Sequence, residues 1–294
     1  MRLLRLIVLA GLGCCPAVGC SARADESAPP PTASERQANT EPSIASDPAT
    51  GSESDADRWL SRLESLAADI TTLESVVRMT SRVDLLDEVT VRFGRLHYAA
   101  DDPPQPVRFA VRFDKLRVDD VIEPIDQAYV FDGRWLLDLD AQDRQATRRE
   151  LVPADGDAAE VMAQGPFPLP LNLQRDRVLQ RFEVTLAPPA DGDPEPYRPV
   201  EGPDAGTAPP QAAEPAVLHL VLTPRPGVDF DGQRLDLWFD TATALPLRSV
   251  TLQEDGDTTQ IDFFRLTPHA DLPDGVFDTA FPEGDWERQT LTID

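Results

Sequence analysis

The sequence predicts a mainly β protein: a single antiparallel sheet of about eleven strands, curled into a half-barrel, whose concave face is lidded by two or three helices. Three observations favour this fold. Eleven segments alternate apolar and polar residues with the period of two that is typical of half-buried strands. Only two or three segments show helical spacing. A long antiparallel sheet with so few helices to cover it is expected to curl instead of staying flat.

One amphipathic helix is expected to open the domain, in the segment SDADRWLSRLESLAADITTL. Ser54 or Asp55 can cap its start, because either side chain can accept a hydrogen bond from a free backbone N–H of the first turn. Its apolar positions recur at helical spacing: Trp59, Leu60, Leu63, Leu66, Ala67, Ile70 and Leu73.

The strands follow in two groups, six before and five after a helical break. The fourth and fifth form a hairpin around Asp132-Gly133, a pair that supplies the positive φ of a tight turn. The first group is predicted at 74–84, 88–98, 106–118, 127–133, 134–140 and 145–153. The helical break is expected at 157–164 and 171–180, and the second group at 181–187, 216–224, 233–240, 245–253 and 258–266.

The first residues resemble a bacterial export signal, in which Arg2 and Arg5 form a short positive region and residues 3–12 an apolar run that is too short to span a membrane. Two cleavage sites of this signal are possible. The sequence AVGC places Cys20 as the lipidated residue of a lipoprotein, whereas ARA at 22–24 fits ordinary cleavage. We expect an exported protein of the periplasm or cell envelope, anchored to a membrane through Cys20, with a signal peptide at 1–20.

Composition limits the kinds of site and partner that the protein can have and the extent of its folded domain. The three cysteines lie in the leader, so the domain has no disulfide framework and no thiolate metal site. The net charge of −25 argues against binding nucleic acid. Residues 21–54 and 188–215 are rich in Pro, Ala and acidic residues, so we expect a disordered tether and a disordered surface insertion, with the folded domain at 55–290.

The order of elements resembles the LolA-like family, which includes the carrier of outer-membrane lipoproteins and its anchored receptor. The stretches that carry the resemblance are YVFDGRWLLDL, FDTATALP, DGDTTQIDF and FDTAFPEG, and the likeness runs from about residue 57 to 288. The resemblance implies an apolar groove that shelters acyl chains of lipoproteins or of another lipid, with no catalytic residues and no cofactor. It also implies an arginine on an early strand that holds the lid, for which Arg92, Arg95, Arg108 and Arg112 are candidates.

The residues expected to line this groove lie at alternating positions of the strands. A slip of one residue would turn a strand's whole apolar set to the other face. The predicted lining is Phe93, Phe109, Val111, Phe113, Leu137, Leu235, Leu237, Phe239, Ile261 and Phe263.

Two other functions stay open. In the first, helices fill the half-barrel as an ordinary core, and the protein is an anchored sensor or interaction subunit that binds an envelope protein. The second is a hydrolase, which would need polar residues converging in the groove, and no such cluster is evident in the sequence. His97, His219 and His269 lie on or beside three different strands, which does not favour a metal site, and no G-x-S-x-G motif occurs. Trp238 is expected to pack under the insertion.

Overall fold

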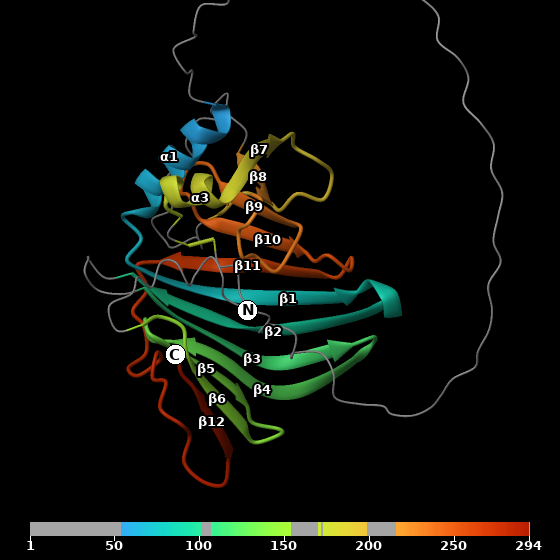
Figure 1. Cartoon of the computed structure of the whole chain (residues 1–294), viewed down its shortest axis with the longest axis vertical. Coiled ribbons are helices and arrows are strands. Elements are labelled where there is room, and N and C mark those ends of the chain that lie inside the picture. Colours follow the sequence, from blue (N-terminus) through green and yellow to red (C-terminus); the bar gives the residue numbers. More distant parts are fainter. Residues whose placement is uncertain (1–53, 101–106, 154–169, 172, 199–215, 294) are drawn as a thin grey trace, which may run out of the picture. The chain divides into compact units, whose positions relative to one another are not determined.

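A single sheet of twelve strands forms the protein in a computed structural model that describes residues 54–100, 107–153, 170–171, 173–198 and 216–293 (Figure 1). The strands are β1 (Thr72–Val83), β2 (Glu88–Ala99), β3 (Arg108–Val118), β4 (Val121–Phe131), β5 (Trp135–Asp140), β6 (Gln145–Glu150), β7 (Phe182–Ala187), β8 (Val217–Pro224), β9 (Arg234–Asp240), β10 (Pro246–Leu252), β11 (Thr258–Pro268) and β12 (Glu287–Leu291). Their order across the sheet is β12-β6-β5-β4-β3-β2-β1-β11-β10-β9-β8-β7.

The mainly β class and the two groups of six and five strands are confirmed, with two corrections. The sheet has a twelfth strand, β12, in the predicted polar tail. This strand pairs with β6 in parallel, so the sheet is not purely antiparallel. β12 and β7 are its two edges, so the sheet is not closed into a barrel.

Helix α1 (Asp55–Ala67) begins as predicted, with the Ser54 hydroxyl accepting a hydrogen bond from the Asp57 N–H at 3.1 Å. It ends earlier than predicted. Ile70 lies beyond the helix and Leu73 belongs to β1. The β-branched run Ile70–Thr72 disfavours continuation of the helix, and Leu73 is wholly buried in the sheet instead.

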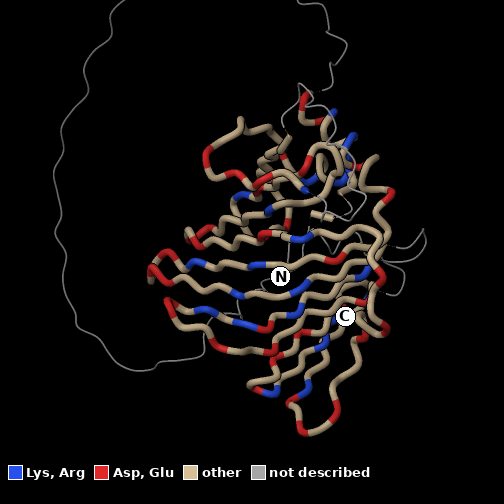
Figure 2. Tube along the Cα trace, turned by 180° about the vertical axis from the view of Figure 1, so that it is seen from behind, with Lys and Arg blue, Asp and Glu red and all other residues tan. Residues whose placement is uncertain are grey.

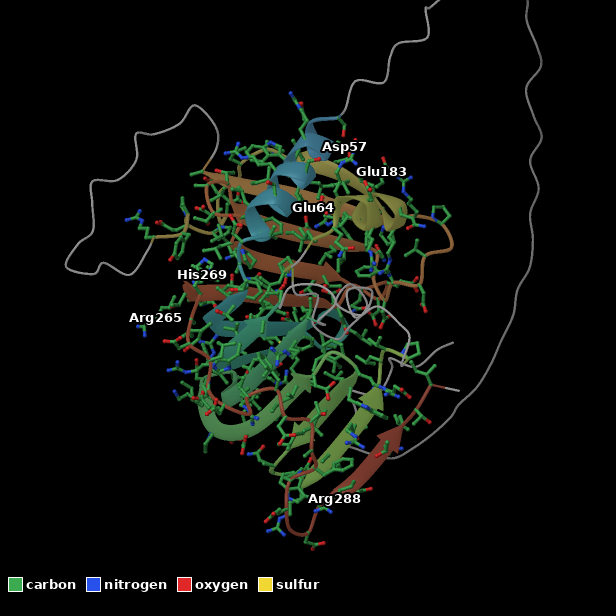
Figure 3. All side chains as sticks on the ribbon, turned by 90° about the vertical axis from the view of Figure 1, so that its left-hand side faces the viewer. Asp57, Glu64, Glu183, Arg265, His269 and Arg288 are labelled. Atoms are coloured by element: carbon green, nitrogen blue, oxygen red, sulfur yellow. The ribbon has the colours of Figure 1, made fainter. Side chains whose placement is uncertain are left out.

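The helical break contains α3 (Arg175–Arg181), which starts four residues later than the predicted 171–180. The helix predicted at 157–164 lies outside the described residues. Asp57 lies in the first turn of α1 (Figure 3). The Arg175 guanidinium of α3 lies 3.2 Å from its carboxylate, and this ion pair joins the two helices.

The two faces of the sheet follow from its register, because residues paired across strands point to the same side. The pairs Val77–Phe263, Leu96–Val111 and Leu237–Leu220 share one side, the front face, on which α1 and α3 lie. The opposite side, the back face, carries pairs such as Arg78–Asp262 and Ala110–Val130.

The front face is covered by helices at one end of the sheet. Leu60 and Leu63 of α1 and Val178 of α3 pack with apolar residues of β7–β9. Each buried leucine contributes about 1.5–3 kcal/mol to the docking of α1. Among the described elements, the helices therefore meet the sheet at β7–β9, which is narrower than the lid expected over the whole concave face (Figure 1).

The back face is covered at the other end by the segment 270–286, which runs over β3–β6. Small side chains on these strands, Ala110, Ala128 and Ala146, let Val276 and its neighbours approach closely. Buried apolar contacts thus hold the segment that leads into β12.

Candidate functional site

The front face is the candidate site, because its apolar residues run across most of the sheet. One buried cluster joins β1–β5 and β11, and a second joins β7–β9 to the helices. Eight of the ten predicted lining residues lie on this face: Phe109, Val111, Phe113, Leu235, Leu237, Phe239, Ile261 and Phe263. The structure does not bring Phe93 and Leu137 to them, since Phe93 pairs with Arg78 and Leu137 with Val130 on the back face.

Of the four candidate arginines, the register places Arg92 on the front face, paired with Met79. Arg95, Arg108 and Arg112 lie on the back face. The Arg92 Nε donates a hydrogen bond to Gln127 Oε1 at 3.2 Å, so Arg92 belongs to a polar group on β2, β4, β5 and β6.

That polar group, the front polar cluster, was missed by sequence reasoning. The Gln127 amide donates to Asp140 Oδ2 at 2.7 Å, and Tyr129 is paired with Asp138 in the neighbouring strand. Arg149 lies beside them on β6, paired with the front-face residue Leu136. The members are Arg92, Gln127, Tyr129, Asp138, Asp140 and Arg149. The hairpin turn at Asp132-Gly133 could have indicated this cluster from the sequence, because the turn fixes which residue of β5 pairs with Tyr129.

Burial sets the electrostatics of this cluster. It raises the pKa of Tyr129 to about 12, helped by the Asp138 carboxylate. It also raises the pKa of Asp138, while the Arg149 guanidinium opposes the shift. The cluster can hold charge and exchange hydrogen bonds at the edge of an apolar surface. Its six members include no serine, cysteine or histidine, the residues that most often make up the nucleophile–base pair of a hydrolase.

Two hydroxyl groups stand between the two apolar clusters of the front face, on β10. Ser249 is paired with Leu237 and Ile261, and Thr251 with Leu235 and Thr259. Both side chains are buried, with exposed fractions of 1% and 6%. Neither hydroxyl has a hydrogen-bond partner in the part of the chain that the structure describes.

On the back face, Trp238 lies under the start of the insertion, as predicted. Its indole N–H donates to Asp193 Oδ1 at 2.8 Å, and Arg248 donates to the Gly192 carbonyl at 2.8 Å. The His219 ring stacks on Trp238 with centroids 3.9 Å apart and lies 2.9 Å from Asp236. Residues 188–198 therefore run over β9 and β10, and residues 199–215 of the insertion lie outside the described residues.

Asp262 is the centre of a buried ionic group on the same face. Arg248 Nε donates to its Oδ1 at 2.6 Å, and Arg78 and Gln260 donate to its Oδ2 at 2.9 and 2.8 Å. Burial would raise the pKa of Asp262, but these hydrogen bonds outweigh it and lower the pKa below its usual value.

Exposed apolar side chains gather at the tips of two neighbouring hairpins. Leu85 and Leu86, 91% and 65% exposed, lie between β1 and β2, while Val121 and Ile122 begin β4. The hairpins lie side by side because β2 pairs with β3 up to Thr90–Val118, at the end where both tips project (Figure 1). Acidic residues surround these tips, as they do other turns of the sheet (Figure 2).

The three histidines lie on or beside different strands: His97 on β2, His219 on β8 and His269 just after β11. The described residues contain no group of three or more His, Cys, Asp or Glu side chains placed to hold a metal ion. No described helix has the length and hydropathy needed to cross a membrane.

Solved structures similar to this open sheet include LolA superfamily proteins, the family that the sequence resembles. One from Nitrosomonas europaea is 12% identical with a TM-score of 0.34, over 76% of this chain and 96% of its own. An uncharacterized conserved protein from Thermus thermophilus is 14% identical with a TM-score of 0.41, over 82% of this chain and 100% of its own.

A third is MucB in its complex with MucA from Pseudomonas aeruginosa, 16% identical with a TM-score of 0.37 over 76% of this chain. This chain spans about three fifths of that neighbour, 61% of its length. No family model matches the sequence, and no curated protein matches it significantly. At TM-scores under 0.5, these likenesses do not bear on what the chain binds.

Proposed function

We propose that the protein binds acyl chains of lipoproteins or of another lipid on its front face, without enzymatic activity, as a carrier or receptor in the cell envelope. The observation that supports this most is the extent of the apolar front face, which continues from β5 through β1 to β9. Among the described residues, helices pack on it at β7–β9. These side chains are themselves buried, so an acyl chain held among them would be kept from water.

The free energy of burying an acyl chain is large enough to hold it on the protein. Burying one methylene is worth about 0.8 kcal/mol, so one 16-carbon chain represents on the order of 10 kcal/mol before the costs of association. An acyl chain cannot cross an aqueous compartment without a shelter of this kind. No reaction is required, and the front polar cluster would lie where a chain meets a polar group.

The cellular setting of this proposal comes from the sequence. Export by the leader and lipidation of Cys20 would place the domain on a membrane of the envelope. Residues 21–54 would then act as the tether, and the half-barrel at 55–290 as the binding domain.

The test uses two neighbouring residues of β1 that point to opposite faces. Met79 lies on the front face and packs against the apolar cluster, whereas Thr80 lies on the back. We expect the exported chain to take up a neutral pyrene-labelled diacylglycerol and to release lipid on extraction. Met79→Glu should weaken uptake at least about tenfold, because a buried charge opposes an apolar ligand, and Thr80→Glu should change it less than about twofold.

Two results would refute the proposal. One is wild-type protein that neither carries lipid nor takes up the probe. The other is equal loss in the two variants, which would show that uptake does not occur on the front face.

A second function, binding of an envelope protein, is favoured by the exposed hairpin tips. Isolated exposed apolar residues are common, but Leu85, Leu86, Val121 and Ile122 are gathered at one end of the sheet. Asp84, Asp87, Asp119 and Asp120 surround them, so a partner would carry an apolar centre ringed by basic residues.

Replacing both Leu85 and Leu86 by serine is expected to abolish recovery of a stoichiometric partner from envelope extract. The free energy of unfolding should change by less than about 0.5 kcal/mol, because both side chains are exposed. Ile293→Ser, at another exposed apolar position, is the control and should leave recovery unchanged. Unchanged recovery with the double variant would argue against the tips as the contact.

A further inference from the structure

The buried hydroxyls of Ser249 and Thr251 are unusual for their position. Both lie on the front face of β10, flanked by Leu235 and Leu237 on β9 and by Ile261 on β11. Their Oγ and Oγ1 atoms are out of contact with water and find no hydrogen-bond partner among the residues that the structure describes. Alanine and valine would fill the same space without burying an unpaired polar atom.

Hydroxyls elsewhere in the protein show that partners are available to buried side chains. Ser75, also on the front face and wholly buried, donates to the Phe264 carbonyl at 2.9 Å. Thr279 donates to the Asp132 carboxylate at 2.6 Å. Among the buried side-chain hydroxyls of the described residues, those of Ser249 and Thr251 are the two without a partner.

We propose that Ser249 and Thr251 hydrogen-bond the carbonyl oxygens of ester- or amide-linked acyl chains bound on the front face. The inference rests on the proposed function and specifies its ligand. Such carbonyls only accept hydrogen bonds, and a hydroxyl can donate one to each. Residues two apart on a strand lie about 6–7 Å apart, within reach of two carbonyls carried by one glycerol-like unit.

The position of the pair between the two apolar clusters fits a ligand with two chains. One chain would extend over β11 and β1 toward Phe263 and Val77, which belong to the first cluster. The other would extend over β9 toward Leu237 and Leu220, which belong to the second. The linking carbonyls would then lie over β10, where the front face carries hydroxyls instead of apolar side chains.

The experiment compares two probes that differ in their carbonyls: a pyrene-labelled diacylglycerol and the dialkyl ether analogue with chains of equal length. Wild-type exported chain should bind the ester about five- to tenfold more tightly than the ether. The Ser249→Ala/Thr251→Val double variant should bind both probes with the affinity that the wild type shows for the ether. Thr259→Val, a hydroxyl on the same face of β11, is the matched control and should keep the ester preference.

Each outcome separates this inference from the proposed function. If the wild type binds neither probe, the proposed function fails and the inference falls with it. If it binds both equally, or if the double variant loses affinity equally for both, acyl binding stands and the hydroxyls are not carbonyl donors. Loss of the ester preference in Thr259→Val would likewise overturn the assignment to Ser249 and Thr251. Thermal unfolding of each variant confirms that the comparison is made on folded protein.

Discussion

Replacing Asp262 by alanine is expected to lower the free energy of unfolding by about 3 kcal/mol. The carboxylate is buried, and its loss leaves Arg248 and Arg78 without the anion that both contact. Breaking a buried ion pair by removing one partner typically costs about 3–5 kcal/mol. The lower end applies because the Arg78 side chain is 40% exposed and can regain water.

Urea unfolding followed by tryptophan fluorescence measures this loss. Asp87→Ala is the control, because Asp87 forms an ion pair with Arg82 in which both side chains are mainly exposed. Such a pair is worth less than about 1 kcal/mol. Equal midpoints for the two variants would show that the Asp262 group does not hold β1, β10 and β11 together.

The same carboxylate makes stability depend on pH in a defined direction. Because hydrogen bonds lower the pKa of Asp262 in the folded protein, the folded state binds its proton less readily than the unfolded chain does. This contribution is fully present above the ordinary aspartate pKa of about 4 and is lost as pH falls through the lowered folded value. Asp262→Asn should flatten the acid side of the stability curve and leave its slope near neutral pH unchanged.

The sequence was sufficient to predict the strands and most of their faces. Alternation placed Phe109, Val111 and Phe113 on the same side of β3, and the structure agrees. The face of Phe93 could not be obtained in this way, because β2 carries apolar residues on both faces: Leu96 points to the front and Phe93, three residues earlier, to the back. A Cβ on Gly94 would lie 2.0 Å from the Arg112 carbonyl oxygen, so this glycine was the available sign of a close approach.

Other features depend on contacts between distant segments. Leu136 and Leu137 are adjacent, so alternation alone cannot tell which faces front, and only the pairing of Leu136 with Phe131 decides it. The sequence of β12, ERQTL, has no apolar alternation that could predict a strand. It joins the sheet through backbone pairing with β6. The front polar cluster likewise appears only when β2, β4, β5 and β6 are set side by side.

Replacing Phe131 by alanine is expected to cost about 3–5 kcal/mol of unfolding free energy, the largest single effect of an apolar truncation that we foresee. Phe131 is fully buried on the front face, with its ring 5.5 Å from that of Phe109. The truncation removes both the buried area and the ring contact, and the strand pairs of β4 prevent the backbone from closing the space. Phe264→Ala is the control, because Phe264 is 43% exposed, and it should cost less than about 1.5 kcal/mol.

Phe131→Ala also tests where an acyl chain lies, if affinity is measured on the folded fraction. A chain that crosses β3 and β4 would lose part of its apolar wall, so the diacylglycerol probe should bind about tenfold more weakly than to the wild type. Denaturant midpoints with and without the probe give the same information, since a ligand that binds only the folded state stabilises it in proportion to its affinity. A large loss of stability with unchanged affinity would make Phe131 a core residue alone and would confine the binding surface to β1, β11, β10 and β9.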